Sequence, residues 1–174
     1  MNSTLLNDHT IFRAELVHSS VFVADGAIIR GDVEIAGDSS IWFNAVLRGD
    51  SDQIRIGKRT NVQDLCLLHC DTGIPCRVGD NVTLGHGAIV HGATVEDDTL
   101  IGIRATLLNN VTIGKGSLIA AGAVVPENTT IPPNSVVMGI PGKIVRSTTA
   151  SDRQRIQKAA QHYVEVAKTY LASS

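Results

Sequence analysis

Three histidines could carry the chemistry of this 174-residue chain: His69, His86 and His91. Neutral imidazoles bind divalent metals, and three of them leave an open position for water, which is typical of catalytic metal sites. Histidines on a protein surface usually have no special role, so their number alone makes no site. The hypothesis depends on where the surrounding elements place the three side chains.

The element that must position them is a six-residue repeat. An aliphatic residue recurs every six positions along most of the chain from Ile11 to Val137. This spacing matches neither the period of a helix, near 3.6, nor that of a simple strand, 2. It is typical of a hexapeptide β-helix, in which short strands wrap around a prism and successive coils stack. Counting three hexapeptides to a coil, we predict an all-β prism of about seven triangular coils.

The end of the chain breaks with this pattern. A Gly-Ile-Pro-Gly turn at 139–142 interrupts the repeat. From 152 to 171 apolar residues recur at helical spacing, which predicts an amphipathic C-terminal α-helix that packs along the prism. Ser151 is the expected N-cap of this helix. We therefore expect a β-helix domain over 1–148 and a closing helix over 149–174.

The repeat also predicts which side chains stack. The residue after the first aliphatic position of each coil points outward, and these residues should form one ladder: Phe12, Arg30, Arg48, His69, His91, Leu108 and Pro126. His69 and His91 should thus be neighbours in adjacent coils, with Arg48 one coil further. The irregular spacings of the repeat fall on the same face, and insertions in a solenoid often mark its functional side.

His86 belongs to another face. It precedes His91 by five residues, so the two Cα atoms should lie roughly 12–16 Å apart around a corner of the prism. Because Zn–N bonds are only about 2.0–2.1 Å long, a metal bound by both within one chain would strain the structure. We expect a neighbouring copy to supply His86, which gives three equivalent sites in a closed trimer.

Composition restricts the classes of partner and compartment. The net charge is −2 with a pI near 6.3 and no basic stripe, so a nucleic-acid partner is not expected. No apolar run reaches the roughly 18 residues of a membrane span. The first residues lack the basic region of a signal peptide, and three cysteines do not suggest a secreted disulfide framework. We expect a cytoplasmic protein, with Cys66 in the core.

Four fragments carry a resemblance to a known family: Arg48-Gly49-Asp50, Asn61-Val62-Gln63-Asp64, Leu68-His69, and Gly85-His86-Gly87-Ala88-Ile89-Val90-His91-Gly92. In this order and spacing the chain resembles the γ-class carbonic anhydrases over nearly its whole length. The resemblance implies a left-handed parallel β-helix that assembles as a homotrimer. It also implies Zn²⁺, or alternatively Fe²⁺ or Co²⁺, bound by His69 and His91 of one chain and His86 of the next.

The activity implied by the resemblance is the reversible hydration of carbon dioxide to bicarbonate by a metal-bound hydroxide at the trimer interface. The same resemblance suggests that Gln63 orients the metal-bound water. Arg48, Asp50 and Asp64 are expected to form an interface network near the metal, where the arginine would hold bicarbonate through charge-assisted hydrogen bonds. Tyr163 is expected to reach the site from the C-terminal helix.

Two departures from the family pattern bear on the activity. Ser51 stands where the archaeal prototype has a glutamate, and the short Cys70-Asp71-Thr72-Gly73 loop lacks the glutamate thought to shuttle protons. Asp71 is a candidate to replace it, and slow proton transfer would make the activity low. Two alternatives therefore stay open: a catalytically weak trimeric metal-binding scaffold, and a hydrolase of the acyl-CoA thioesterase type.

Overall fold

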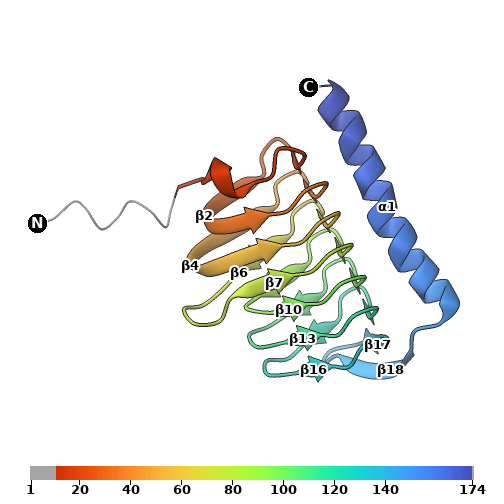
Figure 1. The fold of residues 1–174 in the computed structure, drawn as a ribbon. Coiled ribbons are helices and arrows are strands. Elements are labelled where there is room, and N and C mark those ends of the chain that lie inside the picture. Colours follow the sequence, from red (N-terminus) through yellow and green to blue (C-terminus); the bar gives the residue numbers. More distant parts are fainter. Residues whose placement is uncertain (1–10, 174) are drawn as a thin grey trace, which may run out of the picture.

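The computed structural model describes residues 11–173, which form a parallel β-helix followed by one α-helix (Figure 1). Short strands wrap around a three-sided prism in about six turns, which confirms the predicted left-handed β-helix fold class. The predicted number of coils was slightly too high, because the hexapeptide at Ile11 forms no strand and leads into the 3-10 helix η1 (Ala14–Leu16). Residues 1–10 of the expected first domain and Ser174 of the second lie outside the described residues.

A ten-stranded parallel sheet bends around one corner and forms two sides of the prism, and an eight-stranded sheet forms the third. Each side can be named by what it carries. The histidine face consists of the first halves of β2 (Ile28–Ile35) and β4 (Val46–Ile56), then β6 (Leu67–His69), β9 (Ile89–His91), β12 (Thr106–Leu107) and β15 (Val124–Val125). The charged face consists of the second halves of β2 and β4, then β7 (Cys76–Val78), β10 (Thr94–Val95), β13 (Thr112–Ile113) and β16 (Thr130–Ile131). β2 and β4 therefore turn a corner and belong to both faces.

The third side is the helix face. Its strands are β1 (Phe22–Val23), β3 (Ser40–Ile41), β5 (Asn61–Val62), β8 (Thr83–Leu84), β11 (Leu100–Ile101), β14 (Leu118–Ile119) and β17 (Ser135–Met138). β18 (Lys143–Ser147) follows the turn at 139–142 and pairs with β17 in antiparallel orientation. The hexapeptide period predicted no such strand, because an antiparallel return does not continue the stacking of coils.

The core is a column of aliphatic side chains in register. Leu47, Leu68, Val90 and Leu107 lie one above another on the histidine face and are fully buried. Small inward residues fill the narrow corners between such ladders, and they are equally buried: Ala45, Cys66, Ala88, Ala105 and Ala123. Each large aliphatic residue buried in this way contributes about 1.5–3 kcal/mol. The stacking also fixes the height of every outward side chain along the prism.

Helix α1 (Ala150–Ser173) covers the helix face, running beside β1, β3, β5 and β8 (Figure 1). Its buried residues, Ile156, Ala160, Val164 and Ala167, follow helical spacing and pack against the prism. Within the described part of the chain, no helix is both long enough and apolar enough to cross a membrane. Because α1 packs against the helix face alone, it leaves the histidine face and the charged face uncovered.

The first turn of α1 is closed by Thr149 rather than by Ser151, which lies inside the helix. The Thr149 hydroxyl accepts the Asp152 N–H at 3.2 Å, and the Asp152 carboxylate accepts the Thr149 N–H at 2.8 Å. This reciprocal arrangement is a capping box. The Arg146 guanidinium also donates to Asp152, and these hydrogen bonds hold the pKa of that carboxyl below its usual range.

Candidate metal centre

The paired strands β6 and β9 bring two histidines together on the histidine face. His69 is in register with His91, as the repeat predicted, and Arg48 is in register with His69 on the other side. The two imidazoles lie with Nδ1 of His69 3.1 Å from Nε2 of His91. This juxtaposition follows from strand register alone, since parallel pairing places equivalent outward residues side by side.

Gly49 lets β4 lie close to β2, and the residue that follows it, Asp50, contacts His69. A Cβ atom on Gly49 would lie 2.6 Å from the carbonyl oxygen of Asp32, so a larger residue would push β2 and β4 apart. The residues on either side of Gly49 project to the same side of the strand. Arg48 Nη1 donates to both Asp50 oxygens, at 2.9 and 2.7 Å, and Asp50 also contacts His69 Nε2 at 3.2 Å.

The Asp50 carboxylate is ionised in this setting. Partial burial by itself would raise the pKa of Asp50, but the hydrogen bonds from Arg48 and His69 outweigh it and lower the pKa below its ordinary value. An ionised carboxylate can only accept hydrogen bonds. Nε2 of His69 therefore carries the ring proton, and the lone pair of its Nδ1 faces His91.

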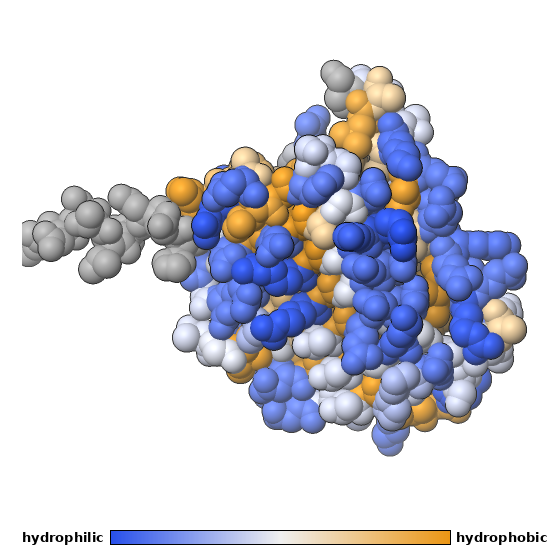
Figure 2. Space-filling model, viewed as in Figure 1, coloured by the Kyte–Doolittle hydropathy of each residue, from blue (hydrophilic) through white to orange (hydrophobic). Residues whose placement is uncertain are grey.

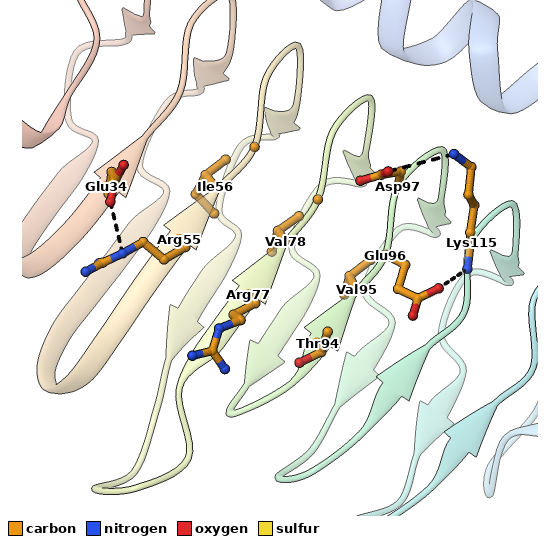
Figure 3. Close-up of a pocket in the computed structure, with 12 residues that line it drawn as sticks. Glu34, Arg55, Ile56, Arg77, Val78, Thr94, Val95, Glu96, Asp97 and Lys115 are labelled. Atoms are coloured by element: carbon orange, nitrogen blue, oxygen red, sulfur yellow. Dashed lines mark hydrogen bonds and ion pairs between the residues drawn. The ribbon is translucent and has the colours of Figure 1, made fainter.

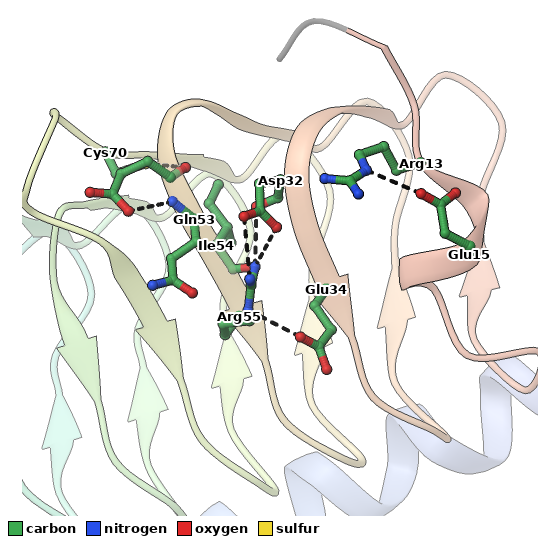
Figure 4. A network of polar contacts seen from close by, with 9 residues as sticks. Arg13, Glu15, Asp32, Glu34, Gln53, Ile54, Arg55 and Cys70 are labelled. Carbon is green, nitrogen blue, oxygen red and sulfur yellow. Dashed lines mark hydrogen bonds and ion pairs between the residues drawn. The ribbon is translucent and has the colours of Figure 1, made fainter. Parts of the chain in front are cut away.

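The second half of the long strand β4 is held from both sides (Figure 4). Arg55 pairs with Asp32 at 2.8 Å and with Glu34 at 3.0 Å, which ties β4 to β2. On the other side the Cys70 thiol donates to the carbonyl oxygen of Asp52 at 3.1 Å. These contacts fix the insertion that follows Arg48-Gly49-Asp50, so Asp50 is held beside His69.

His91 is supported in the same manner by a residue of the next coil. Its Nδ1 lies 2.8 Å from Asn109 Oδ1, and Asn109 Nδ2 donates to Asp71 Oδ2 at 2.8 Å. With the amide oxygen toward the imidazole, Nδ1 of His91 carries the proton and Nε2 carries the lone pair. The nitrogens of His69 and His91 that face each other are therefore both unprotonated acceptors.

Two facing acceptors repel each other, and either a shared proton or a metal ion between them would relieve that repulsion. Two metal–nitrogen bonds of about 2.0–2.1 Å that meet at a near-tetrahedral angle hold their nitrogens roughly 3.3 Å apart. The observed 3.1 Å is close to that separation, so the pair fits a divalent metal. Asp71 completes a group with the two histidines in which all three ligand atoms lie within 4.8 Å of one another.

His86 is placed apart from this group, in the loop after β8. Its Nδ1 lies 2.6 Å from Asp64 Oδ2, and its backbone N–H donates to Gln63 Oε1 at 3.1 Å. Gln63 Nε2 in turn donates to Asn61 at 3.0 Å. The Tyr163 hydroxyl, on α1, lies 3.5 Å from Nε2 of His86. The imidazole remains 45% exposed.

The candidate residues of one chain therefore lie in two separate groups, named here the pair half and the His86 half. The pair half comprises Arg48, Asp50, His69, Asp71, His91 and Asn109, and the His86 half comprises Asn61, Gln63, Asp64, His86 and Tyr163. The sequence predicted that His86 lies apart from His69 and His91, and in the structure Gln63, Asp64 and Tyr163 group with His86. The sequence predicted no role for Asn109, although this residue directly follows Leu108, which stands in the same outward ladder as His69 and His91.

Tyr163 is the one candidate that comes from α1. Its ring packs edge-on against Trp42, with centroids 5.2 Å apart. Burial raises the pKa of the Tyr163 hydroxyl, and the nearby Asp64 charge adds to the effect. The hydroxyl is therefore protonated at neutral pH and can donate to a neighbouring acceptor.

The histidine face carries a mostly apolar and partly exposed stripe beside the histidines. The outward residues that precede the inward ladder stack in register: Ile28, Val46, Leu67, Ile89, Thr106 and Val124. Ile28 is 47% and Leu67 is 36% exposed, and at the adjoining corners Leu65 and Ile103 are exposed as well. Apolar side chains gathered in this way typically mark an interaction surface.

The charged face differs sharply from the histidine face. Figure 3 shows Arg55, Arg77, Glu96 and Lys115 along a shallow hollow over β4, β7 and β10. Figure 2 shows hydrophilic side chains over most of the side of the molecule that is turned to the viewer. With α1 on the third side, the histidine face is the one that pairs apolar exposure with candidate metal ligands.

Comparisons with known proteins agree with the repeat. The family model for bacterial transferase hexapeptide (six repeats) matches residues 92–127, and that for the hexapeptide repeat of succinyl-transferase matches residues 75–98. A solved structure from Bacillus cereus, provisionally described as an acetyltransferase, superposes with a TM-score of 0.89 at 41% identity. That match covers 91% of this chain and 92% of the other.

Similar curated proteins carry the name of one activity. A Methanocaldococcus jannaschii protein named "Probable carbonic anhydrase" is 46% identical over 88% of this chain and 97% of its own length. The mitochondrial gamma carbonic anhydrase 2 of Arabidopsis thaliana is 42% identical over 98% of this chain. This chain spans only 63% of the length of that plant protein.

Proposed function

Because this chain belongs to the γ-class carbonic anhydrase family, we propose that it catalyses the reversible hydration of carbon dioxide to bicarbonate. The proposed site is a metal centre shared between neighbouring copies in a homotrimer. The observation that carries the proposal is the pair of unprotonated nitrogens on His69 and His91, which face each other at 3.1 Å. The names of the similar proteins support the choice of reaction.

In this proposal His69 Nδ1 and His91 Nε2 of one chain hold the metal together with His86 Nε2 of the next. Asp64 occupies Nδ1 of His86 at 2.6 Å, so Nε2, which the Tyr163 hydroxyl approaches at 3.5 Å, is the nitrogen left to bind outside its own chain. Three imidazoles accept Zn²⁺, Fe²⁺ or Co²⁺, and we propose Zn²⁺ first. When bound, such a metal lowers the pKa of water to about 7 and so supplies the nucleophile for carbon dioxide.

The apolar stripe supports assembly through the histidine face. Ile28 and Leu67 would be removed from water by a neighbouring copy, at about 25 cal/mol for each Å² buried. A heterologous contact repeated around a threefold axis closes into a ring of three. The same contact would bring the His86 half of one copy to the pair half of the next. Trimer formation and completion of the metal site are therefore one event in this proposal.

The remaining residues act around the reacting atoms. Arg48 uses Nη1 for Asp50, and we propose that the other guanidinium nitrogens bind a bicarbonate oxygen. The Gln63 carbonyl oxygen accepts the His86 backbone N–H, and one Gln63 amide hydrogen is donated to Asn61. We propose that the second amide hydrogen orients water. Asp71, whose Oδ1 lies 3.9 Å from His91 Nε2, is the carboxylate proposed to accept the proton that is released.

The test is stopped-flow hydration of carbon dioxide on protein purified without oxygen and loaded in parallel with Zn²⁺ and Fe²⁺. The metal content per chain and the mass in solution are measured on the same samples. We expect one metal per chain, a trimer, and hydration that disappears in His86→Ala. His162→Ala, a substitution on an exposed part of α1, is the matched control and should retain hydration. Full metal content in His86→Ala would refute the assigned ligands.

The alternatives make different predictions in the same experiment. A metal-loaded trimer without hydration would favour the scaffold, and turnover of acyl-CoA esters by that sample would favour the thioesterase-type hydrolase. The description of the Bacillus cereus protein as an acetyltransferase gives a reason to include acetyl-CoA among the substrates assayed. A cytoplasmic location stays a prediction.

A further inference from the structure

We propose that Asn109 is a positioning residue of the metal centre: it selects Nε2 of His91 as the ligand atom and aims the Asp71 carboxylate at the same point. The inference deepens the proposed function, and it assigns a role to a side chain that the sequence motifs did not include. It rests on two hydrogen bonds and on the space left by one glycine.

The chemistry of the partners settles the orientation of the amide. An ionised carboxylate only accepts hydrogen bonds, so the group 2.8 Å from Asp71 Oδ2 must be the Asn109 amide nitrogen. The amide oxygen is therefore the atom 2.8 Å from Nδ1 of His91. An oxygen acceptor at that place requires a proton on Nδ1, which leaves the Nε2 lone pair directed at His69. Partners of this type fix the tautomer of metal-binding histidines and raise their basicity.

Gly92 provides the room for this contact. A Cβ atom at Gly92 would collide with the Asn109 amide oxygen and would lie 2.8 Å from Cγ2 of Ile74. Gly92 also has φ +55°, a backbone conformation that residues other than glycine and asparagine rarely adopt. Because Gly92, directly after His91, has no side chain, Asn109 can approach His91 from the next coil.

The second hydrogen bond positions Asp71. Because Asn109 occupies Oδ2, the other oxygen of Asp71 lies toward His91, 3.9 Å from its Nε2. The loop that carries Asp71 is short and closes on itself, with the Ile74 N–H donating to the Asp71 carbonyl oxygen at 2.9 Å. Asn109 therefore ties this loop to the coil beyond His91. Loss of the amide would release the ligand and the carboxylate together.

The direct test is the tautomer of His91 in metal-free protein labelled with ¹⁵N-histidine. Spectra recorded at pH 8, above the ordinary imidazole pKa of about 6.5, distinguish protonated Nδ1 from protonated Nε2. We expect protonated Nδ1 in the native chain and a mixture of tautomers in Asn109→Leu, which keeps the size of the side chain but has no amide. Asn109→Asp retains the acceptor and should restore protonated Nδ1 while it loses the bond to Asp71.

Metal affinity provides a second readout, measured with Zn²⁺ in competition with a chelator. Removal of a hydrogen-bond partner of this kind lowers affinity by roughly 10–100-fold, and we expect that loss in Asn109→Leu and a smaller one in Asn109→Asp. Asn110→Gly is the matched control. It removes a neighbouring bond, from Asn110 to Asn128 at 3.2 Å, and it suits the positive φ of that position.

An unchanged His91 tautomer in Asn109→Leu, or protonated Nε2 in the native chain, would overturn the inference. Asn110→Gly changing the tautomer as much as Asn109→Leu would overturn it too, since the effect would then be general. The spectra do not depend on catalysis. A protein that fails to hydrate carbon dioxide but shows the tautomer shift would refute the proposed function and leave the role of Asn109 standing.

Discussion

The pair half and the His86 half of this chain are built by different means. In the pair half, strand register places His69 beside His91, and their supporting groups come from the coils above and below. In the His86 half, a single histidine stands in a loop, held by Asp64 and approached by Tyr163 from the helix. A β-helix can align residues along one face by stacking, but its corners keep residues of different faces apart. In the proposed site, the third imidazole therefore comes from another copy.

The largest expected effect separates the halves by their ligands. His91→Ala should abolish tight Zn²⁺ binding, because it leaves His69 without its partner. His86→Ala should also abolish hydration but retain weak binding through the cluster of His69, Asp71 and His91. Both losses should exceed the roughly 10–100-fold that a supporting residue costs. Chelator competition measures the affinities, and equal affinities in the two variants would contradict the division into halves.

The next prediction separates the halves in space. Leu67→Asp places a charge on the apolar stripe, so we expect monomers that bind Zn²⁺ no better than His86→Ala does. Light scattering gives the mass, and metal analysis gives the occupancy. Thr94→Asp, on the outward side of the charged face, is the matched control and should remain assembled. A Leu67→Asp trimer with full metal content would show that this stripe is no interface.

A smaller effect compares the two supporting carboxylates. Asp50→Asn and Asp64→Asn each weaken the hold on one imidazole, so each should reduce Zn²⁺ affinity by roughly 10–100-fold. Asp50 also binds Arg48, whereas no ion pair to an arginine is found for Asp64 among the described residues. We therefore expect only Asp50→Asn to raise KM for bicarbonate in the dehydration direction. A rise in KM confined to Asp64→Asn would reverse the assignment of Arg48 to substrate binding.

The smallest effect concerns the helix that carries Tyr163. The pKa of Asp152 is lowered in the folded chain, first by Arg146 and then by Thr149. Its contribution to stability is therefore present above the ordinary aspartate pKa of about 3.9 and is lost as the pH falls toward the folded value. Asp152→Asn should lower the melting temperature at pH 7, and the difference from the native chain should vanish in acid. A difference that persists unchanged at low pH would refute the cap.

Much of the fold follows from the sequence because the core imposes a strict period. Each inward position accepts only an aliphatic or a small residue, so the hexapeptide spacing predicts the coils and the stacking of His69 on His91. The same rule does not predict β18, which pairs antiparallel with β17 outside the repeat. The helical spacing of the C-terminal segment misplaced the N-cap by two residues, since Thr149 and Asp152 satisfy each other through side-chain geometry.

The site was predictable in its ligands and less so in its supports. The expected separation of His86 from His91 came from the length of the chain between two faces, and the structure places them in different groups. The role of Asn109 was not predicted, because its contact with His91 depends on the path of a loop and on glycine, which has no side chain, at position 92. The spacing of residues along the chain does not predict contacts of this kind.

The central claim is that each site is assembled from two copies, and mixed trimers test it most directly. His86→Ala and His91→Ala chains, each inactive alone, are unfolded together in equal amounts and refolded with Zn²⁺. A shared site is intact wherever the first variant supplies the pair half and the second supplies His86. Random mixing then restores about one quarter of the native sites and of the hydration rate. A mixture of His69→Ala and His91→Ala, both in the pair half, should restore none. Equal failure of both mixtures, with trimers formed, would contradict a site shared between copies.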